Sequence, residues 1–311
     1  MSALPRFIVI LGPTATGKSA LGIALAEKLG GEILVCDSTQ VYRHFDIGTA
    51  KVSASEQRGI PHHLVDLVEP DELFTAGEFR RRALEALEDV SRRKRLPILT
   101  AGTGLYLRAL LLGLADAPER SDELRDRLRK RIDLRGAEYL HKILVRMDPA
   151  TAARIAPPDT QKIIRAIEMR LLAGKPVNEI HGGGRAPLEG YDVMKFGLLP
   201  PRPALYARID SRVNAMIAAG WLEEVRQLIT SNVSPTSKPF QFIGYAELRE
   251  HLAGRLSIQQ AVEQIQQATR RFAKRQITWF RREPNVHWIS GFGDDPAIAS
   301  SSMEIIHGAQ S

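Results

Sequence analysis

The segment Gly12–Ser19 constrains the fold of this chain more strongly than any other feature of its sequence. Its residues, GPTATGKS, fit the pattern G-x-x-x-x-G-K-[ST] and lie between an apolar run, Phe7–Leu11, and a stretch with helical spacing, Leu21–Leu29. A strand, a glycine-rich turn and a helix in this order form a loop whose backbone N–H groups bind phosphate. We expect the Lys18 ammonium to reach a terminal phosphate oxygen and the Ser19 hydroxyl to ligate Mg²⁺.

The first third of the chain alternates between short apolar runs and helical stretches. Apolar runs at Glu32–Cys36 and Leu96–Ala101 predict two more strands, and Phe79–Arg93 and Leu105–Leu112 predict helices. This alternation is typical of a parallel sheet with right-handed crossover connections. The sequence therefore predicts an α/β fold, in which a phosphate-loop parallel sheet is flanked by helices.

The pattern changes near Pro118, where helical stretches without a clear strand begin. Val193–Leu199 predicts a return to the sheet, and helices are expected within Ala204–Leu228 and Ser257–Phe280. The last residues are rich in Gly, Asp, Ser and Ala, with little sign of a core. We therefore expect a first core part at residues 1–117, an all-helical insertion at 118–192, a second core part at 193–290 and a flexible tail at 291–311.

Positive charge is concentrated in two segments of the chain. The sequence has 43 Lys and Arg against 36 Asp and Glu, a net charge of +7. Residues 120–170 hold thirteen basic and eight acidic residues, and residues 261–282 hold six basic and one acidic residue. This concentration favours a polyanionic partner, although solvated helix faces would give the same count. In the second segment we expect Phe272, Ile277 and Trp279 to pack into the core.

Composition also bears on the compartment. No run of about 18 apolar residues exists, so we expect no membrane span and no membrane partner. The chain enters its first strand without a basic leader, and we therefore expect no signal peptide. A single cysteine, Cys36, fits a reducing compartment. We expect a cytoplasmic protein and take a monomer as the default oligomeric state.

Polar residues follow the second and third predicted strands. Asp37 comes directly after Glu32–Cys36, and Thr103 follows Leu96–Ala101. In an open parallel sheet the carboxyl ends of the strands face the ligand crevice, so both residues would lie beside the phosphate loop. From this position Asp37 could ligate Mg²⁺, act as a base or cap a helix, and Thr103 could be an ordinary turn residue.

Short motifs in a fixed order extend the pattern over most of the chain. They are GPTATGK at 12–18, DSTQVY at 37–42, DIGTAK at 46–51, PHHLVD at 61–66, GTGLY at 102–106, RIDSR at 208–212, IGY at 243–245 and KRQITWFR at 274–281. The phosphate loop alone is generic, but the ordered set is specific. It resembles the bacterial tRNA dimethylallyltransferase family. One departure is Ala101, where that family often has glycine before the GTG motif.

The resemblance implies a prenyl transfer to tRNA. A dimethylallyl group would pass from dimethylallyl diphosphate to N6 of the adenosine on the 3′ side of the anticodon, with release of diphosphate. The phosphate loop would then hold a leaving group, with Mg²⁺ as cofactor and the anticodon stem-loop of tRNA as partner. By the same resemblance Asp37 takes the proton from the amine. Lys18, Ser19 and Arg212 stabilise the departing diphosphate, with Arg208 as a second choice.

The resemblance also assigns the binding residues. Diphosphate binding falls to Gly12, Pro13, Thr14, Ala15, Thr16, Gly17, Lys18 and Ser19. Contacts to tRNA fall to Asp37, Ser38, Thr39, Gln40, Thr103, Arg125, Gln161, Lys162, Ile163, Ile164 and Arg165. The basic residues among these, Arg125, Lys162 and Arg165, lie in the basic segment 120–170, which independently favours a nucleic-acid contact.

Other functions for the phosphate loop stay open at this point. The main alternative is a small-molecule kinase that uses ATP, but the sequence shows no convincing lid with an array of arginines. A non-catalytic RNA-binding ATPase would leave Asp37 unexplained. An adenylate prenyltransferase shares the chemistry but takes a free nucleotide, and the basic insertion argues for tRNA instead.

Overall fold

The structure is a computed structural model that describes residues 4–182, 186–231 and 233–308. The chain forms two compact units. The first unit contains the residues up to Leu111 and those from Glu189 onward, and the second contains Leu112–Leu188. The sequence placed the helical insertion at residues 118–192, close to this second unit.

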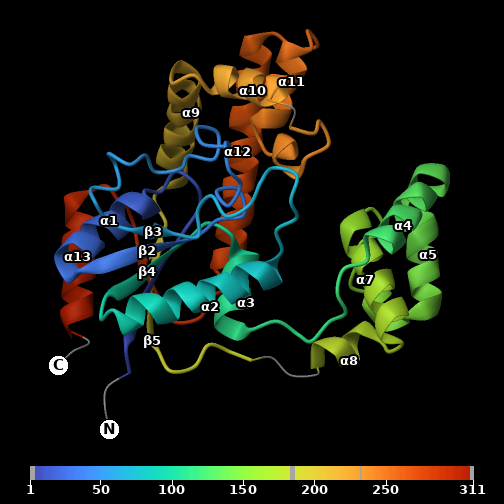
Figure 1. Ribbon diagram of the computed structural model, residues 1–311, viewed down its shortest axis with the longest axis horizontal. Coiled ribbons are helices and arrows are strands. Elements are labelled where there is room, and N and C mark those ends of the chain that lie inside the picture. The colour runs from blue at the N-terminus through green and yellow to red at the C-terminus, as the bar shows by residue number, and fades with distance from the viewer. Residues whose placement is uncertain (1–3, 183–185, 232, 309–311) are drawn as a thin grey trace. The chain divides into compact units, whose positions relative to one another are not determined.

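The first unit is built on one parallel sheet of six strands in the order β3-β2-β4-β1-β5-β6 (Figure 1). Every neighbouring pair is parallel, as the alternation of strands and helices predicted. Two short strands, β3 and β6, were not predicted. The strands are β1 Arg6–Leu11, β2 Gly31–Cys36, β3 His62–His63, β4 Leu96–Ala101, β5 Asp192–Leu198 and β6 Val286–Ile289.

Helices connect the strands and extend from the sheet. Helix α1 lies against β2 and β4, and a separate pair, α9 and α12, packs together after β5. The helices of this unit are α1 Lys18–Leu29, α2 Ala76–Arg92, α3 Gly104–Leu112, α9 Arg202–Ala218, α10 Trp221–Thr230, α11 Tyr245–Leu252, α12 Ile258–Phe280 and α13 Pro296–Gly308, with a short 3₁₀ helix at Lys238–Gln241.

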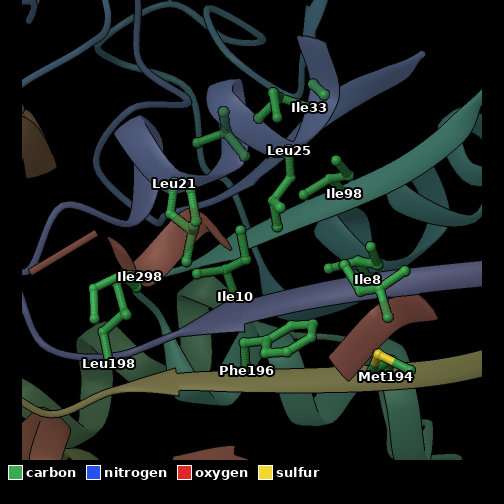
Figure 2. Close-up of a cluster of buried hydrophobic side chains, with 14 residues drawn as sticks. Ile8, Ile10, Leu21, Leu25, Ile33, Ile98, Met194, Phe196, Leu198 and Ile298 are labelled. Atoms are coloured by element: carbon green, nitrogen blue, oxygen red, sulfur yellow. The ribbon is translucent and has the colours of Figure 1, made fainter. Parts of the chain in front are cut away.

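An apolar cluster fills the space between α1, α13 and one face of the sheet (Figure 2). Ile8 and Ile10 of β1 point to this face because alternate residues of a strand share a side. Leu21 and Leu25, one helical turn apart on α1, meet them. This core fixes the start of α1, and therefore the phosphate loop, against the end of β1.

The prediction of a flexible tail at residues 291–311 was wrong for the residues that the structure describes. Residues 296–308 form α13, and Ile298, Ala299 and Ile306 are buried in the same cluster as α1. Ile298 and Ile306 are eight residues apart, which places them on one face of a helix. The small residues between them hide this spacing in the composition.

The second unit contains only helices among its described residues. Its core gathers apolar side chains from α4, α5, α6, α7 and α8, including Leu140, Leu144, Ile163, Ile167 and Ile180. Buried Asp148 accepts hydrogen bonds from two backbone N–H groups and so closes one end of this core. The helices are α4 Asp122–Arg135, α5 Ala137–Met147, α6 Pro149–Ala152, α7 Thr160–Ala173 and α8 Val177–Gly182.

None of the helices in the described ranges is both long enough and apolar enough to cross a lipid bilayer.

Candidate active site

Three loops meet at the carboxyl edge of the sheet. The strands β2, β4 and β1 are direct neighbours, so the residues that follow them lie side by side. Asp37 follows β2, Gly102 and Thr103 follow β4, and Gly12 opens the phosphate loop after β1. The N–H groups of Gly102 and Thr103 both donate to the carbonyl of Cys36, at 3.0 and 3.1 Å. These bonds join the loop after β4 to the start of the Asp37 loop.

The phosphate loop presents backbone donors that the protein does not use. Within the described ranges, the N–H groups from Ala15 to Ser19 donate to no protein acceptor. The loop holds its own shape, because Thr16 Oγ1 and Lys18 Nζ each donate to the carbonyl of Pro13 at 2.9 Å. Free N–H groups at the start of a helix form an anion site.

The Lys18 ammonium adds positive charge to this anion site. Together, the free N–H groups and Lys18 form a diphosphate cradle. Burial lowers the pKa of Lys18 from its ordinary value of 10.5 to about 8. The Asp37 carboxylate opposes the shift, and the Arg212 guanidinium adds to it. A lysine with this pKa is charged at neutral pH.

The affinity of the free protein for inorganic diphosphate should therefore depend on the charge of Lys18. We expect wild-type protein to bind diphosphate about tenfold or more tightly than Lys18→Met at pH 7. This ratio should shrink as the pH rises through about 8, because the wild-type ammonium then loses its proton. Isothermal titration at pH 7, 8 and 9 measures the ratio. A ratio that is constant over this range would show that Lys18 does not titrate beside the anion.

Asp37 keeps one carboxylate oxygen free. Its Oδ1 atom accepts hydrogen bonds from the N–H of Thr39 at 2.9 Å and from the Thr39 hydroxyl at 2.7 Å. Its Oδ2 atom accepts no hydrogen bond from any residue in the described ranges. A Cβ atom on Gly102 would lie 2.8 Å from Oδ2, so only glycine lets the β4 loop approach this closely. The carboxylate is therefore held by one oxygen, and the other can accept a proton.

The other predicted residues of this edge support the Asp37 loop. Thr103 Oγ1 accepts a hydrogen bond from the Ser38 N–H at 3.0 Å. Gln40 Nε2 donates to the carbonyls of Thr49 and Ala50, at 3.0 and 3.3 Å. These bonds join the loops after β2 and β4 and fasten Gln40 to the segment that follows. The structure thus brings Ser38, Gln40 and Thr103 together with the phosphate loop.

Arg212 is a half-buried cation that forms no ion pair with the described residues. It makes no hydrogen bond or ion pair with another residue of the described ranges. Burial lowers its pKa and the neighbouring Arg208 lowers it further, whereas Asp37 and Glu56 oppose the shift. Leaving such a cation unpaired is unfavourable unless a ligand supplies the negative charge. Arg212 and Lys18 therefore favour an anion at this edge.

A segment after β6, which the sequence assigned to a tail, lies against the phosphate loop. The N–H of Gly293 donates to the carbonyl of Thr16 at 2.8 Å. Asp294 Oδ1 accepts a hydrogen bond from Arg208 at 2.7 Å, and this bond lowers the pKa of Asp294. The Arg208 guanidinium also lies 4.6 Å from the ring centre of Phe292. Arg208 is thereby held in place, while Arg212 is left free.

The residues fit a magnesium ion that is shared with a diphosphate. The Ser19 hydroxyl bonds to no residue in the described ranges, which leaves it able to ligate Mg²⁺ as predicted. The same ranges hold no group of three or more His, Cys, Asp and Glu residues that could bind a metal alone. Mg²⁺ usually keeps several waters and takes oxygens from phosphates, so one protein hydroxyl beside a diphosphate suits it.

Within the second unit, the predicted tRNA contacts have different environments. Arg125 and Arg165 donate to the buried carboxylate of Glu168, at 2.7 and 2.6 Å. Lys162 is 69% exposed and pairs with Asp159 at 2.5 Å, an ion pair worth little at a surface. Lys162 is therefore better placed than the two arginines to exchange its partner for a phosphate.

Two of these predicted contacts need correction. The side chains of Ile163 and Ile164 are 0% and 3% exposed and lie in the core of the second unit. They therefore cannot reach RNA from this position, and they hold α7 in its bundle instead. Their neighbour Gln161 is exposed on the first turn of the same helix.

A basic groove lies on the first unit beside Thr103. It is lined by Lys274, Arg275, Thr278, Trp279 and Arg282. The prediction that Trp279 packs into the core was wrong, because its side chain is 38% exposed. A Cβ on Gly104 would lie 2.1 Å from the indole, so glycine lets Trp279 approach the start of α3. An exposed indole among cations is a surface on which a base can stack.

Comparison with known proteins assigns the family. The IPP transferase family matches residues 40–283, which include the Asp37 loop from Gln40 onward, the β4 loop, Arg208 and Arg212 of α9 and the basic groove. The chain belongs to the IPP transferase family.

Relatives agree with this family over nearly their whole length. The chain is 52% identical to a tRNA dimethylallyltransferase of Koribacter versatilis, covering 97% of this chain and 98% of the relative. It is 49% identical to a tRNA dimethylallyltransferase of Solibacter usitatus, covering 96% of each. These similarities favour the predicted tRNA dimethylallyltransferase over the kinase alternative.

Solved structures of IPP transferases share the fold. A full-length tRNA isopentenylpyrophosphate transferase from Bacillus halodurans is 35% identical, with a TM-score of 0.71, covering 97% of this chain and 96% of that one. A eukaryotic dimethylallyltransferase acting on tRNA is 28% identical, with a TM-score of 0.81, covering 97% of this chain and 78% of that one. The predicted α/β fold class is confirmed by these similarities.

Proposed function

We propose that this enzyme transfers a dimethylallyl group from dimethylallyl diphosphate to N6 of the adenosine on the 3′ side of the anticodon in tRNA. The observation that carries the proposal is that anion-binding groups and a proton acceptor lie at the same edge of the sheet. An anion can bind there to the unused N–H groups, Lys18 and Arg212. At the same edge, the free Oδ2 of Asp37 can accept a proton. A diphosphate leaving group supplies the anion, and an amine nucleophile supplies the proton.

The residues divide the reaction between them. The N6 nitrogen forms a bond to the first carbon of the dimethylallyl group while the bond from that carbon to the diphosphate oxygen breaks. The electron pair of the broken bond leaves with diphosphate, where Lys18, Arg212 and the loop N–H groups stabilise the added charge. Asp37 Oδ2 takes the proton that N6 loses. When bound beside Ser19, Mg²⁺ would neutralise part of the diphosphate charge.

Recognition of tRNA would use exposed lysine and arginine side chains and the indole of Trp279. The target base must leave the anticodon-loop stack, which requires a few kcal/mol and a surface that holds the displaced strand. The basic groove offers Lys274, Arg275 and Arg282 for phosphates and Trp279 for stacking. Lys162 and Gln161 offer a second surface on α7. We also propose a cytoplasmic location and a monomeric enzyme.

Substitution of Arg282 by Ala in this groove should weaken tRNA binding at low salt. The affinity should become less dependent on salt, because one fewer phosphate contact releases fewer counterions, with a change in slope of about 1. Filter binding between low and moderate salt measures the slope, and Lys162→Ala tests the second surface in the same way. An unchanged slope would show that the substituted cation does not face the RNA.

An acceptor comparison tests the function. The protein and Mg²⁺ are incubated with labelled dimethylallyl diphosphate and, in parallel, with unmodified tRNA, AMP or ADP. Label in tRNA alone supports the proposal. Label in AMP or ADP would indicate an adenylate prenyltransferase, and consumption of ATP without prenyl transfer would indicate a kinase or ATPase.

A further inference from the structure

One buried amide joins the two loops that carry the proposed chemistry. Gln276 lies near the end of α12, four residues before Phe280, and is 7% exposed. Its Oε1 atom accepts a hydrogen bond from the Thr14 N–H of the phosphate loop at 2.8 Å. Its Nε2 atom donates to the carbonyl of Gly102, in the loop after β4, also at 2.8 Å. Both functions of a single amide are therefore used between two loops that are far apart in sequence.

Each of the two loops contacts a different part of the site. The phosphate loop continues from Thr14 into the free N–H groups and Lys18, which face the anion. Gly102 lies against the free oxygen of Asp37, because a Cβ atom added to Gly102 would lie 2.8 Å from Oδ2. The amide thus fixes the distance between the anion cradle and the groups around the base.

The position of α12 does not depend on this amide. On the same helix, Ala273 and Ile277 pack with Ala15, Leu205 and Ile209 in a separate apolar cluster. Apolar packing of this kind holds a helix in place without a particular hydrogen bond. Burial of a polar side chain beside such a cluster has a desolvation penalty, which the two hydrogen bonds of Gln276 offset.

We propose that Gln276 is a positioning residue that sets the register between the diphosphate cradle and the Asp37 loop. The inference rests on the proposed function, because it concerns the alignment of leaving group and base in that reaction. Gln276 touches neither reacting group. It acts through Thr14, whose N–H is not among the free cradle donors, and through Gly102. Its loss should therefore lower kcat far more than it weakens binding of diphosphate.

Gln276→Glu gives a pH signature that a loss of stability would not give. A carboxylate accepts the Thr14 bond but cannot donate to Gly102, whereas the protonated acid has the same shape as the amide and can do both. Burial raises the pKa of such a carboxyl, which brings protonation within the working pH range. We expect kcat about a hundredfold below wild type at pH 8, with the ratio of variant to wild type rising as the pH falls to 6.

Two variants complete the experiment. Gln276→Met matches the size of the amide but cannot form its hydrogen bonds. The ratio of its kcat to the wild-type kcat should therefore stay low and constant with pH. Gln264→Glu places the same charge on an exposed position of α12 and should behave as wild type. Titration with inorganic diphosphate should give unchanged stoichiometry in all three variants, and less than a threefold change in affinity in Gln276→Met and Gln264→Glu. The proposal would be overturned if the ratio of the Gln276→Glu kcat to the wild-type kcat did not change with pH. It would also be overturned if this variant lost affinity for diphosphate but kept the wild-type kcat.

The two Gln276 hydrogen bonds form a clamp between Thr14 and Gly102. Hydrogen exchange tests this clamp without turnover. In Gln276→Met the peptide that contains Thr14 should exchange faster than in wild type and in Gln264→Glu, and unchanged exchange would contradict the clamp. Wild-type protein that transfers to no acceptor would overturn the proposed function, and with it the role in alignment. A clamp that fails in an active wild-type enzyme would overturn only the inference about Gln276.

Discussion

Asp37→Asn should lower kcat for transfer to tRNA by about 10³-fold while diphosphate binding is retained. The amide can still accept the Thr39 hydrogen bonds at its oxygen, so the loop keeps its shape. It cannot take a proton from N6, and general base catalysis contributes on the order of 10²–10⁴ in rate. Single-turnover transfer of labelled donor measures the loss, with titration of inorganic diphosphate alongside.

Glu263→Gln is the matched control for Asp37→Asn, because Glu263 is an exposed carboxylate on α12. The control should transfer at the wild-type rate. Equal loss of transfer and of diphosphate binding in Asp37→Asn would show that Asp37 holds the metal or the loop instead of acting as the base.

Arg212→Ala should lower kcat by about 10²–10³-fold without lowering the melting temperature. The arginine has no hydrogen bond or ion pair with the described residues, so its removal breaks no ion pair. The lost attraction to Asp37 and Glu56 is offset by relief of the repulsion from Arg208. The rate falls because the leaving diphosphate loses one fixed positive charge in the transition state. A catalytic loss without a loss of stability is the signature of a residue that serves the ligand.

The melting temperature and kcat of Arg212→Ala are compared with those of Arg202→Ala. Arg202 is exposed at the first position of the same helix, α9, and should tolerate the change in both measurements. A marked drop in the melting temperature of Arg212→Ala, with a rate that falls only in proportion to the folded fraction, would assign Arg212 to the fold.

Sequence reasoning succeeded where the signal is local. The strands around the phosphate loop are continuous apolar runs, and their bounds agree with prediction to within one residue for β1, β2 and β4. Asp37 and Thr103 were placed at the ligand edge by a rule of parallel sheets that needs only the ends of strands. Local periodicity and topology together therefore located the site.

Sequence reasoning failed where long-range partners decide the outcome. β3 has only two residues and forms because β2 offers an unpaired edge. α13 was hidden by small residues, although Ile298 packs on the α1 side of the sheet. Gln276 looks like one polar residue of an amphipathic helix, and only the fold shows that it reaches both Thr14 and Gly102.

Charge patterns were equally limited without a structure. Arg125 and Arg165 counted as basic residues of the insertion, yet both are bound to Glu168. Trp279 was counted as core, but Gly104 allows it to lie on the surface among the cations of the groove. Net charge along the chain therefore indicated a polyanionic partner but not which side chains are available to it.

The position of the transferred group tests the central claim most directly. Unmodified tRNA is prenylated with labelled donor, digested to nucleosides and analysed by mass spectrometry, beside a tRNA whose adenosine 3′ to the anticodon is replaced by guanosine. We expect one N6-dimethylallyl adenosine in the first tRNA and no transfer to the second. Label at another nucleoside, or equal transfer to both tRNAs, would contradict it.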